Sequence, residues 1–272
     1  MLQDLAHTVW AFGLLAIAFV PLERAFAPKP VPVLRQAFTT DSLYFLGQYL
    51  LWNAPVLAWL ELLRRLLEHA PLGELRAGFA AWPFWVQFVV AMGLSDVAIY
   101  WAHRLQHQVP WLWRFHRVHH TAEHVDWLAA HREHPLDNLY TRTIENLPLL
   151  VLGFSLQGIA AFVVFRGMWA LFIHSHCRIS LGPLDALLGS PRLHHWHHAI
   201  EGGGRVNFAN LSPLMDLVFG TYHDPGRFPE RVGIAEPHAR SYLGALLEPL
   251  LPKRAPAANG SPPRALTGAA GS

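Results

Sequence analysis

The histidines of this chain are concentrated in one part of the sequence. Of 18 histidines, 14 lie between His103 and His198, and long apolar segments flank them. Most belong to three short blocks: AHRLQH at 102–107, HRVHH at 116–120 and HHWHH at 194–198. Residues three or four positions apart share one face of a helix, so each block would present its imidazoles together. Any fold of this chain must therefore accommodate clusters of polar rings.

The three blocks predict a site for metal ions. Their spacings give eight candidate ligands: His103, His107, His116, His119, His120, His194, His197 and His198. Four ligands satisfy most protein-bound zinc ions, so eight imidazoles suit two ions side by side with open positions. Imidazole also binds iron, copper and nickel, and the spacing alone does not choose the metal. Histidines that are merely frequent are the alternative, but burying so many unpaired rings would be costly.

Further motifs accompany the blocks in a fixed order. They are DVAIYWAHRLQH at 96–107, HREHPLD at 131–137, FIHS at 172–175, PRLHHWHH at 191–198 and NFANLSPLMDLVFGTY at 207–222. Together with HRVHH, and over roughly residues 90 to 224, they resemble the fatty acid hydroxylase/sterol desaturase superfamily. Ala209, Met215 and His176 depart from the residues usual there. The resemblance implies an integral-membrane, non-haem di-iron oxygenase that acts on lipids.

Several expectations about the site follow from this resemblance. Two iron ions and O₂ as co-substrate are implied, with His134 and His174 as possible extra metal ligands. Asp216 is expected to bond a box histidine or a box arginine, and His176 to lie next to the ligands. Ligating histidines must be neutral, so activity is expected to fall as the pH drops through about 6.5.

The electrons that the implied reaction with O₂ consumes must come from outside the chain. The single cysteine, Cys177, excludes an internal disulfide and a cysteine-bound iron–sulfur cluster. Gly202–Gly204 lacks the strand and helix that would make a phosphate-binding loop, so no organic cofactor site is predicted. We therefore expect a separate electron donor of the cytochrome b5, ferredoxin or reductase type. A net charge of +2 and the lack of a basic block argue against nucleic acid.

The resemblance favours hydroxylation of an unactivated C–H bond of a fatty acyl, sterol or isoprenoid/carotenoid lipid. Histidine spacing does not separate this from desaturation. A membrane cytochrome with bis-histidine haem and a metal carrier or structural zinc protein are the remaining alternatives. The cytochrome would need single histidines paired across helices, which is not the pattern seen.

The composition indicates a membrane protein, and together with the apolar stretches and the resemblance it predicts an all-α integral-membrane fold with about four transmembrane or re-entrant helices and a cytoplasmic helical cap that carries the metals. Hydrophobic residues make up 52% of the chain and charged residues 15%. Apolar stretches run over 8–22, extendable to about 27, over 43–63 and over 79–101, each near the length that crosses a bilayer. A signal peptide is the alternative for the first stretch. Arg24, Lys29 and Arg35 favour a cytoplasmic side, whereas Arg64, Arg65 and Arg76 oppose it.

The apolar stretch from Leu136 to Ile173 must turn back on itself. A single crossing would put the third histidine block on the side opposite the first two, so a hairpin broken near 154–158 is expected. Arg166 in its returning limb either snorkels or lines a polar cavity. Asp96, two turns before His103 on one helix, is expected to hold a ligand histidine or its neighbour by a hydrogen bond.

The sequence thus divides into three parts. Residues 1–78 would form N-terminal membrane helices, 79–224 the catalytic domain, and 225–272 a C-terminal extension. From about residue 252 the extension is rich in Pro, Ala, Gly and Ser and is expected to be disordered. We expect a multi-pass protein of a bacterial inner membrane, with its active site on the cytoplasmic side and its lipid substrate drawn from the bilayer.

Overall fold

A computed structural model describes residues 2–201 and 203–251 of the chain. The regular elements among the described residues are all helices, and no strand forms apart from one antiparallel bridge between Ala199 and Val232. The all-α prediction is therefore confirmed. The tail beyond residue 251, expected to be disordered, lies outside the described residues.

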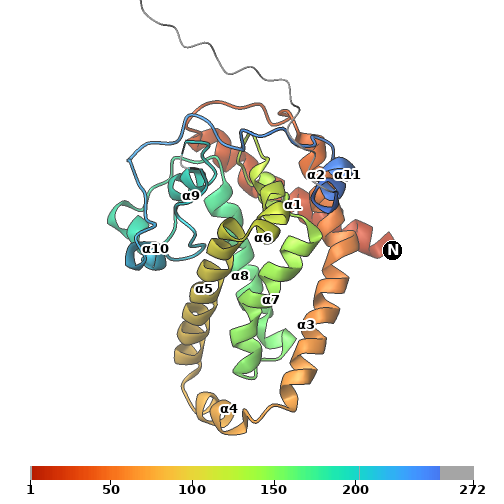
Figure 1. Cartoon of the computed structure of the whole chain (residues 1–272), viewed down its shortest axis with the longest axis vertical. Helices are drawn as coiled ribbons and strands as arrows, with labels where there is room; N and C mark the ends of the chain where they lie inside the picture. Colours follow the sequence, from red (N-terminus) through yellow and green to blue (C-terminus); the bar gives the residue numbers. More distant parts are fainter. Residues whose placement is uncertain (1, 202, 252–272) are drawn as a thin grey trace, which may run out of the picture.

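Four long helical segments run along the long axis of the molecule (Figure 1). They are α3 (Asn53–Glu68), α5 (Phe84–Gln108), α7 (Pro135–Val151) and α8 (Leu156–His174), and the short α4 (Gly73–Ala80) joins α3 to α5 at one end. Their common core contains Leu60 of α3, Met92 of α5, Leu149 of α7 and Phe162 of α8. The helices α6 (Pro110–His120) and α9 (Pro191–His197) lie together at the other end.

The predicted hairpin is confirmed. α7 ends at Val151 and α8 begins at Leu156, so the chain reverses between 152 and 155, slightly earlier than expected. Gly153 adopts a φ of +93° in this turn, a conformation that suits glycine. The reversal returns His174 to the end of the molecule where α7 began. The third histidine block can therefore reach the first two.

The N-terminal half departs from the expected boundaries in two places. The second apolar stretch is helical from Phe38 through Glu68, as α2 (Phe38–Gly47), a π-helical turn (Gln48–Trp52) and α3. Pro55 lies in the first turn of α3, directly after the π-helical turn, and the helical path continues past it. The third stretch begins later than predicted, after Pro83, and continues as one helix through the first histidine block.

Two helices of the described residues, α1 (Leu2–Phe26) and α5, are long and apolar enough to cross a membrane by length and composition. α1 leaves large apolar side chains exposed, among them Trp10 at 72% and Ile17 at 74%. α8 contributes a shorter apolar segment, Ile159–His174. α3 has only 16 residues and carries the charged residues Glu61, Arg64, Arg65 and Glu68, so it is both shorter and more polar than α1 and α5.

The remaining elements surround the histidine end. They are two 3₁₀ turns (Ala129–His131 and Gly182–Ala186), α10 (Leu214–Val218), α11 (Tyr242–Leu247) and a final 3₁₀ turn (Glu248–Leu250).

Candidate metal centre

The first histidine group is built at the corner between α5 and α6. His103 and His107 lie one turn apart near the end of α5. Val109 is extended and Pro110 opens α6, so the chain turns sharply between the two helices. The turn brings the α6 histidines back against α5, and the Nε2 atoms of His103 and His116 are 3.1 Å apart.

Five histidines form this group: His103, His107, His116, His120 and His197. Each offers a ring nitrogen, and these atoms lie within 4.8 Å of one another. The loop after α9 passes close to it at Gly204, which has a φ of +63°. A Cβ on Gly204 would lie 3.1 Å from the His107 ring, so the close approach needs glycine here.

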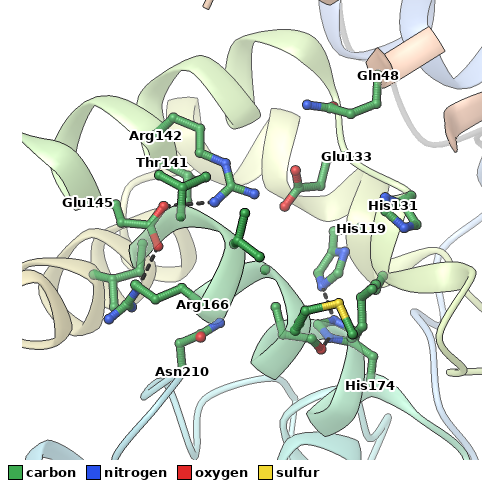
Figure 2. A pocket seen from close by; sticks show the side chains of 18 of the residues that line it. Gln48, His119, His131, Glu133, Thr141, Arg142, Glu145, Arg166, His174 and Asn210 are labelled. Carbon is green, nitrogen blue, oxygen red and sulfur yellow. Dashed lines mark hydrogen bonds and ion pairs between the residues drawn. The ribbon is translucent and has the colours of Figure 1, made fainter. Parts of the chain in front are cut away.

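The second group contains four buried histidines: His119, His174, His194 and His198. The Nε2 of His174 lies 3.0 Å from that of His119 and 2.9 Å from that of His194 (Figure 2 shows the first of these contacts). Two nitrogens bound at a right angle to one metal, each about 2.1 Å from it, are about 3.0 Å apart. The spacing of these rings is that of neighbouring ligands.

Each HxxHH block is shared between the two groups. On α6, His116 and His120 belong to the first group and His119 to the second. On α9 the assignment is reversed, with His194 and His198 in the second group and His197 in the first. Because adjacent residues of a helix point in different directions, the consecutive pair in each block reaches two separate centres. The motif thus places two metal positions side by side.

Hydrogen bonds at the outer ring nitrogens set the tautomers. The Nδ1 of His103 donates to the carbonyl of Phe208 at 2.7 Å, and the Nδ1 of His197 donates to that of Val206 at 2.8 Å. In the second group, His174 donates from Nδ1 to the Ala170 carbonyl at 2.7 Å. A carbonyl can only accept, so the proton is on Nδ1 and the Nε2 lone pair points into the group, as a metal requires.

Several ring nitrogens have no partner within the protein. The buried Nε2 atoms of His107, His120 and His197 lack a hydrogen-bond partner among the described residues. Unpaired buried polar atoms are costly, and here three of them fall within one group of histidines. The donor set, its tautomers and these unpaired nitrogens all fit bound metal ions.

The structure thus brings together all eight predicted histidines and one of the two predicted extra ligands, His174. His134, predicted as a possible ligand, lies in neither group. Its Nδ1 instead caps α7 by accepting from the Leu136 N–H at 3.1 Å, and its Nε2 donates to the Leu246 carbonyl at 3.1 Å. Both ring nitrogens are occupied by backbone groups, so His134 has a structural role.

The three residues expected to support the ligands do so indirectly or not at all. Asp96 forms no hydrogen bond with a histidine in the described part of the chain; it accepts from the backbone N–H groups of Leu211 and Ser212 at 3.1 and 3.0 Å. Asp216 accepts from the Phe208 N–H at 2.8 Å, so it fixes the segment whose carbonyl holds His103. His176 donates to the Lys29 carbonyl at 3.1 Å, away from both groups.

Asp137, to which the sequence analysis gave no role, is the carboxylate in direct contact with a box histidine. Its Oδ2 accepts from His116 Nδ1 at 3.0 Å, and its Oδ1 accepts from Gln106 at 2.6 Å. Its place in the HREHPLD motif, three residues after His134, was the only indication in the sequence that Asp137 has a role at the site. We expect Asp137→Asn to weaken iron binding about 10- to 100-fold, because partners of this kind orient and polarise the ligand.

Iron titration of the metal-free protein would measure the effect of Asp137→Asn. Asp185→Asn is a suitable control, because Asp185 is also buried but bonds Ser180 and the Leu181 N–H. Equal iron affinity in both variants would show that Asp137 does not support the ligand.

Burial keeps the histidines neutral. It lowers the pKa of His116 and of His195 to about 3, and it lowers the pKa of His119 and His198 well below the usual 6.5. In the metal-free protein the buried rings therefore resist protonation until the pH is well below 6.5, and the fall in activity near pH 6.5 stays a prediction.

The same shifts predict that the metal-free protein is acid-labile. Between about pH 6.5 and 3 the unfolded chain binds protons that the folded chain does not, so stability falls as pH falls through this window. A His195→Gln variant lacks one of these groups. As the pH falls inside the window, its free energy of unfolding should therefore decrease by about 1.4 kcal/mol per pH unit less than that of the wild type. Thermal unfolding at a series of pH values tests this; identical slopes for both proteins would contradict it.

A cavity of about 550 Å³ adjoins the metal centre. Box histidines from both groups line it, together with apolar side chains of α1 and α8. The π-helical turn and α7 add polar and charged side chains to its wall, as Figure 2 shows. Arg166 lines this cavity and is only 3% exposed, which settles the choice between snorkelling and cavity lining.

Comparison with known proteins agrees with this geometry. Residues 88–221 match the family model described as fatty acid hydroxylase. The chain belongs to the fatty acid hydroxylase and sterol desaturase superfamily. The matched region begins within α5 and ends just after α10, so it includes both histidine groups.

The curated relatives are lipid oxidoreductases. An ornithine lipid hydroxylase of Rhizobium tropici is 33% identical over 62% of this chain and 51% of its own length. Human alkylglycerol monooxygenase is 31% identical over 51% of this chain and 31% of its own. A Delta(7)-sterol 5(6)-desaturase of Gibberella zeae is 29% identical over 63% of this chain and 48% of its own. The chain thus spans about half the length of these relatives or less, and no solved structure matches it significantly.

Proposed function

We propose that this chain is a membrane-bound di-iron oxygenase that hydroxylates an unactivated C–H bond of a lipid. The observation that carries the proposal is the pair of adjoining histidine groups beside a cavity with one apolar wall. O₂ and two electrons with two protons would convert R–H to R–OH and water. Two bound irons would supply the activation of O₂ that no side chain can provide.

The protein's own residues prepare and shield the reaction. The Nδ1 hydrogen bonds fix the ring orientation of the ligands before metal enters. Leu14 and Leu15 of α1 and Met168 and Leu171 of α8 line the cavity and would hold an alkyl chain while excluding water. The bond to be oxidised would be positioned by this channel rather than by the metals.

The setting of the enzyme is part of the proposal. We place α1, α5 and the α7–α8 hairpin in the membrane, with α2 and α3 as a further limb, and the two histidine groups at the cytoplasmic face of a bacterial inner membrane. The catalytic unit would comprise 79–224, between the N-terminal membrane helices of 1–78 and the extension from 225. A cytochrome b5-, ferredoxin- or reductase-like donor would supply electrons.

Iron content and oxygen chemistry of the detergent-purified protein test the proposal. We expect about two irons per chain and O₂ uptake after reduction when a lipid substrate is added, with a product that gains one oxygen atom by mass spectrometry. A product that instead loses two hydrogen atoms would identify a desaturase, which the sterol desaturase relatives make the second candidate. A haem absorbance band, or metal binding without oxygen consumption, would refute both.

A further inference from the structure

The short helix α10 is inverted compared with an ordinary surface helix. Its one acidic residue, Asp216, is 1% exposed, whereas the apolar side chain of Val218 is 68% exposed. Leu214 and Leu217 of the same helix, and Phe219 directly after it, are also exposed. A helix that faces water normally turns its charged residues outward and its apolar residues inward. The outer face of α10 is therefore suited to an apolar environment.

Hydrogen bonds fix this orientation of α10. The Asp216 carboxylate accepts from the backbone N–H groups of Phe208 and Ala209 at 2.8 and 2.9 Å. It also accepts from the Thr221 hydroxyl at 2.7 Å. Turning the helix to hide its apolar face would break these three bonds and leave buried polar groups without partners, which is costly. The apolar face of α10 thus stays on the outside of the molecule.

The 3₁₀ turn Gly182–Ala186 shows the same inversion. Its Asp185 is buried and accepts from the Leu181 N–H at 2.9 Å. The leucines in and beside the turn are exposed: Leu181, Leu184 and Leu187. The chain after this turn is bonded to the chain before α10, because the Gly189 N–H donates to the Leu211 carbonyl at 2.8 Å. We call α10 and this turn together the apolar edge.

The apolar edge is continuous with the exposed face of α5. The rings of Phe219, directly after α10, and Trp101 of α5 are in contact, with their centroids 4.8 Å apart. Trp101 belongs to a stripe of exposed apolar residues that lie three or four positions apart on α5 and so share one face: Leu94, Val97, Trp101 and Leu105. α5 is long and apolar enough to cross a membrane. The edge thus extends a surface that the proposed setting places in lipid.

The apolar edge lies at the level where the membrane would meet water. In Figure 1, α10 lies beside the end of α5 that leads into α6 and the histidine groups. The Arg104 guanidinium lies 5.4 Å from the centroid of the Trp101 ring. Tryptophan is enriched at membrane–water interfaces, and arginine extends its charged end from there into water. A bilayer that surrounds α5 up to Trp101 would therefore also meet α10.

We propose that the apolar edge is seated in the interfacial layer of the bilayer, so that lipid is the partner of this surface. The inference rests on the membrane setting of the proposed function and extends it to a part of the chain outside the long helices. Apolar faces of interfacial helices are inserted about 5–10 Å into that layer. The contact also bears on the metal centre, because Asp216 fixes the Phe208 segment whose carbonyl accepts from His103. Lipid contact at the edge thereby anchors the first histidine group at the membrane surface.

Fluorescence quenching in lipid nanodiscs tests this without relying on turnover. A Val218→Cys variant of the full chain is labelled with bimane and placed in phosphatidylcholine nanodiscs with or without brominated acyl chains, which quench the label on contact. The single native cysteine, Cys177, is fully buried, so the label goes to the new site. We expect the brominated discs to quench this label about as strongly as one at Val89→Cys, an exposed position within α5.

Glu236→Cys is the matched control. Glu236 is exposed in the C-terminal extension, so a label there should keep its fluorescence in both kinds of disc. An unquenched Val218 label beside a quenched Val89 label would overturn the inference: emission typical of water would show a free surface, and blue-shifted emission would show that protein, such as a second copy of the chain, covers it. Equal quenching at Glu236 would overturn it as well. An unquenched Val89 label would refute the membrane setting itself, so the two failures are distinguishable.

Discussion

Replacing His119 by alanine is expected to lower the iron content from about two ions per chain to about one. His119 belongs to the second group, whereas the first group retains all five of its histidines. Removal leaves three histidines at the second position, including His174, which loses its neighbour at 3.0 Å. Loss of a hydrogen-bond partner of a ligand already lowers metal affinity or activity about 10- to 100-fold. Loss of the ligand itself should therefore reduce lipid oxidation by more than about 100-fold.

His195→Gln is the matched control for this variant. His195 lies within the HHWHH block and is as buried as its neighbours, but its Nε2 donates to the carbonyls of His174 and Ser175 at 3.2 and 3.1 Å. A glutamine amide can supply the same donor, so about two irons should remain. Metal analysis by mass spectrometry and O₂ uptake measure both variants. If His119→Ala kept two irons, or if His195→Gln lost as many, the assignment of these rings to the metal positions would be wrong.

The ligand blocks were predictable because their geometry is local. Positions three and four residues apart meet on any helix, and HRVHH and HHWHH are indeed helical over most of their length. What spacing could not give was the division of each block between two groups. That division depends on how α6 and α9 face one another. His174 was likewise ambiguous, because a lone histidine at a helix end gains meaning only when the hairpin returns it to the other rings.

The supporting contacts were largely missed because they join segments distant in sequence. Asp96 is bonded to backbone groups 115 and 116 residues away, and His116 to a carboxylate 21 residues away. Helical spacing placed Asp96 on the His103 side of α5. It could not show that the 211–212 loop would reach Asp96 first. The hairpin, by contrast, was predictable from a topological requirement: the histidine blocks had to lie on one side.

A second large effect is expected from Asp41→Asn, a change outside the metal centre. Asp41 is fully buried and forms ion pairs with two arginines, Arg35 at 2.8 Å and Arg132 at 2.6 Å. An asparagine has no negative charge, so Arg132 would lose its only ion-pair partner among the described residues. Breaking a buried ion pair on one side typically costs about 3–5 kcal/mol, because the remaining charge is left uncompensated.

The Asp41→Asn change should also affect the metal site, because Arg132 connects the two. Arg132 donates its side chain to Asp41 while its carbonyl accepts from His119 Nδ1 at 3.3 Å, so displacement of Arg132 loosens a ring of the second histidine group. We therefore expect Asp41→Asn to lower the thermal unfolding midpoint and to weaken iron binding. Glu61→Gln on α3 is the control, since the ion pairs of Glu61 with Arg64 and Arg65 are solvent-accessible and contribute little to stability. Equal midpoints and iron contents for the two variants would show that the buried arginine–aspartate network does not hold the metal centre in place.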